Sequence, residues 1–155
     1  SASRQAFDSW AHAAQGALRP HYRGPCGEAG PEAAGISIRA LEPWDPRFGE
    51  SDRAVAYAWL RYDTASAEVL DADVLLNAQG FRLGDGAGGT FDTQSVVLHE
   101  LGHVLGLAHS CGLPGRTYAS CFSVPDEPPG HRLEILEAVM APTLSPGTLR
   151  RGLGA

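Results

Sequence analysis

The sequence lacks several features that mark particular classes of protein. It has no apolar run approaching the roughly 20 residues that a membrane-spanning helix needs. It has no basic cluster and carries a formal net charge of −6, so nucleic acid is not an expected partner. Charged residues make up only 19% of the chain, and no internal repeat is present. These absences leave a globular protein, and 155 residues suffice for one domain with a core.

What the chain does have is a motif at residues 99–109, which read His-Glu-Leu-Gly-His-Val-Leu-Gly-Leu-Ala-His. Positions four apart lie on one face of a helix, so His99 and His103 can bind one metal ion. Glu100 lies next to the first of these ligands, where its carboxylate can reach a water on the metal without taking a coordination site. This spacing is typical of a zinc site with its own general base.

The second half of the motif supplies a third ligand. Gly106 permits a positive φ and is a common stop signal for a helix, so the chain can turn there and bring His109 to the metal. Three protein ligands leave one tetrahedral position open, as catalytic zinc requires and structural zinc does not. The alternative, an amphipathic helix that carries histidines by chance, does not account for Gly106 and His109 at their set spacings.

These residues resemble the metzincin family of zinc endopeptidases. That family has a methionine-containing turn beneath the metal, and the single methionine of this chain, Met140, lies downstream of the ligands and close to Pro142. The alternative for Met140 is ordinary core filler. Within the metzincins the likeness is to the matrixins, and it is specific over residues 91–110, with Ser110 directly after the third histidine. The sequence departs from matrixins at Leu144, where they usually have tyrosine, and it lacks the histidine-rich loop of their structural zinc.

The resemblance implies an α+β fold in which a small twisted mixed sheet has two long helices above a cleft, with an irregular lower subdomain after the third zinc ligand. We expect a single catalytic domain over residues 1–155, divided into an upper subdomain (about 1–106) and a lower one (about 107–155). Matrixins have a strand before the first helix and a closing helix after the methionine turn. Neither is present, so we expect a chain trimmed at both ends.

The pattern of the residues predicts the individual elements. Apolar spacing predicts a first helix over 3–18, capped by Ser3 and ended by Pro20. Alternation and β-propensity predict three strands, at 35–41, 53–62 and 69–76. The glycine-rich residues 84–89 are expected to form a flexible loop. Asp92 or Thr93 is expected to cap the metal-binding helix, over about 93–106, and a short helix is expected near 131–138 in an otherwise irregular segment.

The chain has three cysteines, an odd number for an exported protein. Cys111 and Cys121 flank a turn-rich segment, and the protease motif implies an oxidising compartment, so we expect a disulfide between them. The alternative is a pair of reduced, buried thiols. Cys26 is left over, and would pair with a cysteine upstream of residue 1 if the chain is a fragment.

The expected function is zinc-dependent hydrolysis of peptide bonds in a protein or peptide substrate, by a secreted or extracytoplasmic monomer. The resemblance implies that the substrate lies antiparallel to an edge strand at about 54–60. It also implies a specificity pocket between the metal helix and residues 142–144. Two alternatives stay open: a zinc-stabilised binding module without catalysis, which would have no use for Glu100, and a zinc hydrolase of another amide bond.

A second metal is weakly suggested. Asp71 and Asp73 alternate on a predicted strand and can line a structural calcium site together with loop carbonyls. They can equally be solvated strand residues, which is the interpretation we prefer.

Overall fold

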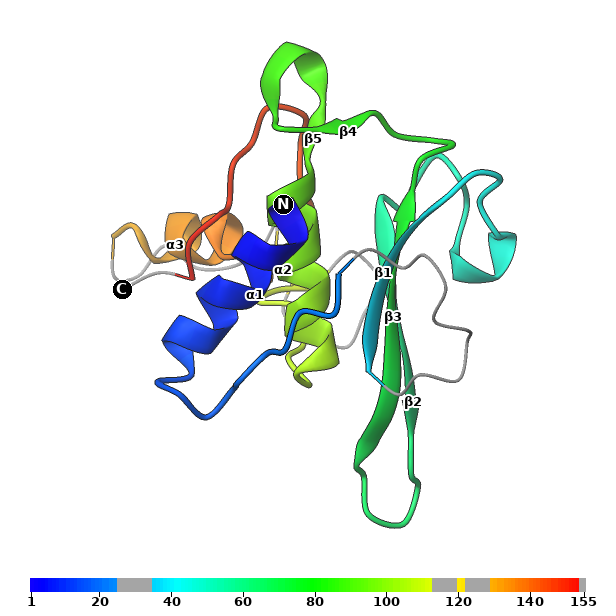
Figure 1. Cartoon of the computed structure of the whole chain (residues 1–155). Coiled ribbons are helices and arrows are strands. Elements are labelled where there is room, and N and C mark those ends of the chain that lie inside the picture. Colours follow the sequence, from blue (N-terminus) through cyan, green and yellow to red (C-terminus); the bar gives the residue numbers. More distant parts are fainter. Residues whose placement is uncertain (25–34, 113–119, 122–128, 154–155) are drawn as a thin grey trace.

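The structure is a computed structural model that describes residues 1–24, 35–112, 120–121 and 129–153. Its helices and strands follow in the order α1 (Ala2–Ala13), β1 (Ile36–Leu41), β2 (Ala56–Tyr62), β3 (Val69–Asn77), β4 (Leu83–Gly84), β5 (Phe91–Asp92), α2 (Thr93–Val104) and α3 (His131–Glu137). Two short 3-10 turns occupy Pro46–Phe48 and Ala87–Gly89. The predicted α+β class is confirmed, and Figure 1 shows the arrangement of the elements.

The main sheet is mixed and has the strand order β1-β3-β2. β1 runs parallel to β3, and β2 runs antiparallel to it, with Ala58 opposite Val74. In the second half of β3, residues 74–77 are buried whichever face of the sheet their side chains lie on. Because the strand order is β1-β3-β2, β2 lies at an edge of the sheet, and among the described residues no strand pairs with its outer side. β2 corresponds to the edge strand at about 54–60 that is expected to bind the substrate.

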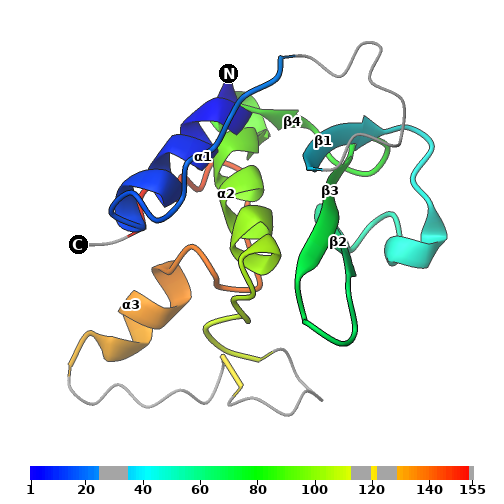
Figure 2. The ribbon, with the colours of Figure 1, turned by 60° about the horizontal axis from the view of Figure 1, so that its bottom comes forward.

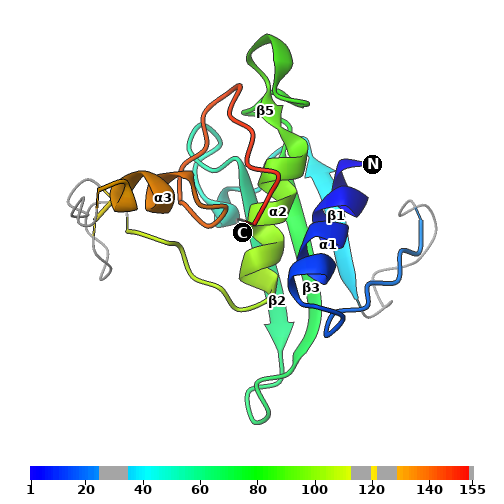
Figure 3. The ribbon, with the colours of Figure 1, turned by 90° about the vertical axis from the view of Figure 1, so that its left-hand side faces the viewer.

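Two helices cover one face of the sheet, with α2 between α1 and the strands (Figures 1 and 3). Apolar side chains of α2, including Val97 and Leu98, are fully buried in a core that also contains Val74 of β3. The indole of Trp10 on α1 donates from Nε1 to the Leu98 carbonyl of α2 at 2.9 Å. The sheet and α1 thus hold α2 from opposite sides, and this fixes the element that carries two of the candidate ligands.

The first helix differs from its prediction at both ends. It begins one residue earlier, with Ser1 as the cap that accepts from the Arg4 N–H, so the assignment of the cap to Ser3 was wrong. It ends at Ala13, well before Pro20, because Gln15 and Gly16 take positive φ angles of 48° and 87° and turn the chain. The apolar spacing continued to residue 18, but backbone geometry ended the helix first.

Three smaller corrections concern the strands and loops. β2 begins at Ala56 rather than 53, because Arg53 and Ala54 donate their N–H groups to the Glu50 carbonyl in a turn. The loop predicted at 84–89 contains a 3-10 turn, and it lies between the short strands β4 and β5, which were not predicted. Two-residue strands give too short an alternation to be recognised in a sequence.

The other segments agree with their predictions to within one or two residues where the structure describes them. β1, β3 and α3 match the expected 35–41, 69–76 and 131–138, and α2 ends two residues earlier than expected. Cys26 and much of the irregular segment between Gly112 and Pro129 lie outside the described residues. Within the described parts of the chain, no helix has the length and apolar character to cross a membrane.

Candidate metal centre

The start of α2 is fixed by a buried carboxylate. Asp92, only 1% exposed, caps the helix by accepting from the Ser95 N–H at 2.9 Å. Arg151 donates to the same carboxylate from Nη2 at 2.6 Å and from Nε at 3.0 Å. Burial raises the pKa of Asp92, but the hydrogen bonds from Arg151 and Ser95 outweigh it and hold this pKa below its usual value. Of the two caps that the sequence allowed, Asp92 is therefore the one used.

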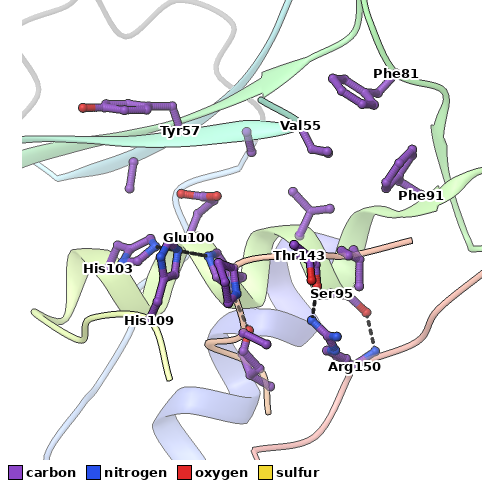
Figure 4. Close-up of a pocket in the computed structure, with 18 of the residues that line it drawn as sticks. Val55, Tyr57, Phe81, Phe91, Ser95, Glu100, His103, His109, Thr143 and Arg150 are labelled. Atoms are coloured by element: carbon purple, nitrogen blue, oxygen red, sulfur yellow. Dashed lines mark hydrogen bonds between the residues drawn. The ribbon is translucent and has the colours of Figure 1, made fainter. Parts of the chain in front are cut away.

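The end of α2 positions the third histidine. Gly106 takes a positive φ of 87°, its N–H donates to the His103 carbonyl, and the Leu107 N–H donates to the Gly102 carbonyl. This pair of hydrogen bonds is a Schellman motif, which reverses the chain in two residues. His109 is thereby brought back against the face of the helix that carries His99 and His103, as Figure 4 shows.

Three imidazole nitrogens converge at one point. The Nε2 atoms of His99 and His103 are 3.1 Å apart, and the Nε2 atom of His109 lies 3.2 and 3.1 Å from them respectively. The three residues form the one group of three potential metal ligands found in the described part of the chain. The spacing and the turn predicted this convergence, and the structure provides it.

The outer nitrogens of two of these rings are occupied by backbone carbonyls. His99 Nδ1 lies 2.7 Å from the Val139 oxygen, and His103 Nδ1 lies 2.8 Å from the Leu107 oxygen. A carbonyl can only accept, so both Nδ1 atoms carry the proton, and the Nε2 atoms present lone pairs. These carbonyl partners orient the rings. They were not predicted, because a backbone acceptor leaves no mark in the sequence.

The residues fit a tetrahedral cation well. Bonds of about 2.0–2.1 Å in tetrahedral geometry require nitrogens roughly 3.3–3.4 Å apart, close to the separations seen here. Lone pairs aimed at one another repel unless a cation lies between them. Burial lowers the pKa of His99 to about 4, so this ring is neutral at pH 7, as a metal ligand must be. A three-imidazole set suits zinc among the first-row metals.

Glu100 lies beside this group without belonging to it. It is 7% exposed, and burial raises its pKa to about 7, although a hydrogen bond from the Ala58 N–H of β2 acts in the opposite direction. A carboxyl group whose pKa lies near neutrality can both accept and return a proton. The contact with Ala58 also places this carboxyl at the level of the edge strand, between the metal ligands and the sheet (Figure 4).

The segment around Met140 supports the ligands from below. The Val139 carbonyl accepts from His99, and the Met140 carbonyl accepts from the N–H of Ser110, the residue after the third ligand, at 2.9 Å. The Met140 side chain is buried and lies so close to Gly102 that a Cβ there would meet its sulfur. Gly102 lies within residues 99–109, and the absence of a side chain at this position leaves room for the Met140 sulfur.

A cavity of about 560 Å³ adjoins the three histidines and Glu100. Val55, the residue before β2, lines one wall of the cavity together with Tyr57. Residues 141–144 and Arg150 line the opposite wall. Leu144, which replaces the expected tyrosine, is among these lining residues. Phe81, Phe91 and Arg150 were not predicted, because they are distant in sequence from the motif and belong to no recognisable pattern.

The remaining predicted sites are simpler. Cys111 and Cys121 are joined by a disulfide with an S–S distance of 2.10 Å. Asp71 forms an ion pair with Arg61 at 3.4 Å, and Asp73 forms one with Arg39 at 2.9 Å. Each of these two carboxylates thus has an arginine partner on a neighbouring strand, and neither belongs to a potential metal-binding group of the described residues.

Comparison with known families agrees with this geometry. The family model of the matrixins matches residues 1–113, which include α1, the sheet, α2 and all three histidines. The chain belongs to the matrixin family. Matrixins are zinc-dependent peptidases, so the three-histidine group of this matrixin has the ligand chemistry of its family. Searches of curated proteins and of solved structures found no match.

Proposed function

We propose that this matrixin is an endopeptidase in which His99, His103 and His109 hold one catalytic zinc ion and Glu100 is the general base. The observation that carries the proposal is the convergence of three Nε2 atoms beside a buried carboxyl group with a pKa near 7. When bound, zinc supplies Lewis-acid chemistry: it polarises the scissile carbonyl and lowers the pKa of water. The other steps belong to residues of this chain.

Glu100 transfers the proton. Its carboxylate accepts a proton from the attacking water and then delivers it to the amine that leaves. The Ala58 N–H orients this carboxylate, and burial keeps its pKa close to the pH at which it must both gain and lose a proton. His99 and His103 are held by the Val139 and Leu107 carbonyls, so the ligands need little rearrangement during a turnover.

The outer edge of β2 binds the substrate backbone. Because β2 pairs only with β3 among the described strands, its other edge can accept an extended peptide as an additional antiparallel strand. Such a peptide passes between β2 and α2, where its scissile bond meets Glu100 and the histidines. This mode of binding places an internal peptide bond at the site, as an endopeptidase requires.

The test is digestion of a denatured protein or a peptide library by the zinc-loaded protein, read by mass spectrometry. Glu100→Ala should retain one equivalent of zinc and lose activity by on the order of 10²-fold or more, the usual contribution of a positioned acid or base. Glu68→Ala removes an exposed carboxylate from the hairpin between β2 and β3 and is the matched control, with wild-type activity expected.

Two results would contradict the proposal. Cleavage by Glu100→Ala at nearly the wild-type rate rejects the role of this residue. A wild-type protein that holds zinc and cleaves no peptide bond is instead a binding module, or a hydrolase of another amide.

A further inference from the structure

Two adjacent arginines of the C-terminal segment have opposite environments. Arg151 is fully engaged by the buried Asp92 in a two-pronged ion pair. Arg150 points the other way and lines the cavity next to the metal ligands. Its backbone N–H donates to Ser95 Oγ of α2 at 2.7 Å, so the residue is anchored to the helix that carries the ligands (Figure 4).

The Arg150 guanidinium is held by neutral acceptors. Nη1 donates to the Thr143 carbonyl at 2.6 Å, and Nη2 donates to the Leu136 carbonyl at 2.7 Å. The Nε–H group is buried and has no hydrogen-bond acceptor in the described structure. An arginine carries five N–H donors in a planar fork, and each Nη atom makes one hydrogen bond, so besides the buried Nε–H each Nη atom keeps one donor for a ligand that enters the cavity.

The charge of Arg150 lacks a direct counter-ion. No carboxylate of the described residues forms an ion pair with it. Burial lowers the pKa of its guanidinium, and the exposed Glu137 offsets this only in part. Arginine stays charged nevertheless, so the half-buried cation is incompletely compensated. The other charged side chains lining the cavity are Arg53, also a cation, and Glu100, which the proposed chemistry requires.

The position of Arg150 along a bound peptide follows from the direction of β2. Glu100 contacts Ala58. Figure 4 shows Arg150 and Thr143 on the Val55 side of Glu100, towards the start of β2. A peptide antiparallel to β2 has its C-terminal half at the start of that strand. Arg150 therefore lies on the side of the cavity that would receive the residues after the scissile bond.

We propose that Arg150 determines specificity by selecting substrates with glutamate directly after the scissile bond. This inference rests on the proposed peptidase function and deepens it. Apolar lining residues such as Val96 and Leu144 pack against the methylene groups of the glutamate, and its carboxylate accepts from the free donors of Arg150. The incoming carboxylate supplies the counter-ion that the cavity lacks.

The first test compares peptides that differ only at the residue after the scissile bond, which is glutamate, its neutral isostere glutamine, or leucine. A charge-assisted hydrogen bond in a partly buried site predicts a kcat/KM for glutamate on the order of tenfold to a hundredfold above that for glutamine. Equal values for the two, or a preference for leucine, would overturn the inference while leaving the peptidase function intact. No cleavage of any peptide would contradict the proposed function itself.

Variants separate charge from scaffolding. Arg150→Gln removes the charge and should abolish the preference for glutamate over glutamine, whereas Arg150→Lys keeps the charge and should retain most of it. If Arg150 only braces Thr143 and Leu136, each variant slows all peptides equally and the ratio stays as in the wild type, which contradicts the inference. Arg4→Gln, on the exposed face of α1, is the control and should leave the ratio unchanged.

Binding gives a readout that does not depend on turnover. The zinc-loaded Glu100→Ala protein should bind the glutamate peptide more tightly than the glutamine peptide in calorimetry, and increasing salt should reduce the difference. The double variant Glu100→Ala with Arg150→Gln should bind both peptides alike. A preference for glutamate that persists in the double variant would assign the selectivity to another residue and refute the role of Arg150.

Discussion

The two walls of the cavity are built in different ways. One wall consists of α2 and β2, whose backbones are held by the hydrogen bonds of a regular helix and a sheet. The other wall, residues 139–150, contains no helix or strand and is held by individual hydrogen bonds (Figure 2 shows the ribbon from below). The Arg150 guanidinium donates to the Thr143 and Leu136 carbonyls, and the Ser110 N–H donates to the Met140 carbonyl.

This difference separates chemistry from selectivity. The ligands and Glu100 need fixed positions, and a helix packed between α1 and the sheet provides them. Beyond Val139 and Met140, which contact the ligand segments, the irregular wall can change shape without moving the metal ligands, because few of its contacts are backbone ladder bonds. The family model matches residues 1–113, which include the regular wall and exclude the irregular one. We therefore expect substitutions in the first wall to affect zinc and turnover, and those in the second to affect stability and substrate choice.

The largest effect is expected in the regular wall. His103→Ala leaves two imidazoles, which cannot hold zinc as three do, so tight binding and activity should both be lost. Metal analysis after dialysis against a mild chelator measures this. His12→Ala on the exposed face of α1 is the control and should keep one equivalent. Retention of a full equivalent of zinc by His103→Ala would mean that the ligands are misassigned.

Substitutions of Met140 test how the two walls are coupled. Met140 is buried against Gly102, so Met140→Ala should lower the free energy of unfolding by roughly 2–5 kcal/mol. Met140→Leu conserves volume and should cost under about 1.5 kcal/mol while keeping zinc and activity. Thermal unfolding of both zinc-bound variants gives the answer. An alanine variant as stable as the wild type would show that this residue does not support the metal site.

The disulfide lies outside both walls, where Cys111 and Cys121 pack against side chains of α3. Peptide mapping of unreduced protein should recover Cys111 and Cys121 linked, and replacing both with serine should cost on the order of 2–3 kcal/mol, the value for a short closed loop. Because neither cysteine belongs to the metal-binding group, zinc content should not change. Free, alkylatable thiols at both positions in protein isolated without reductant would refute the pairing.

A smaller effect is expected at the start of α2. The pKa of Asp92 is lowered in the folded state, so its carboxylate stabilises the fold above its unfolded-state pKa of about 3.9. That stability disappears as the pH falls through the lower, folded-state value. Asp92→Asn should cost about 1 kcal/mol near pH 7 through the weaker cap and the lost ion pair. It should also flatten the acid limb of a denaturation profile measured on metal-free protein, and a profile identical to the wild type would reject this role.

The sequence predicted the regular wall well, and the reason is physical. Helical spacing and the Gly106 turn determine where His99, His103 and His109 converge, and both are local properties of the chain. The irregular wall depends on contacts between distant residues, such as Arg150 with Ser95 and His99 with the Val139 carbonyl. Such contacts leave no periodicity in the sequence. The end of α1 was missed for a related reason, because the apolar spacing continued past the turn at Gln15.

X-ray absorption at the zinc edge of the loaded protein measures the proposed coordination itself. The spectrum should show one zinc ion with three imidazole nitrogens at about 2.0–2.1 Å and an oxygen donor in the remaining position. The spectrum of Glu100→Ala should show the same three nitrogens, because this carboxylate is not a ligand. A sulfur ligand, fewer than three imidazoles, or loss of a coordinating atom in Glu100→Ala would contradict the three-histidine zinc site.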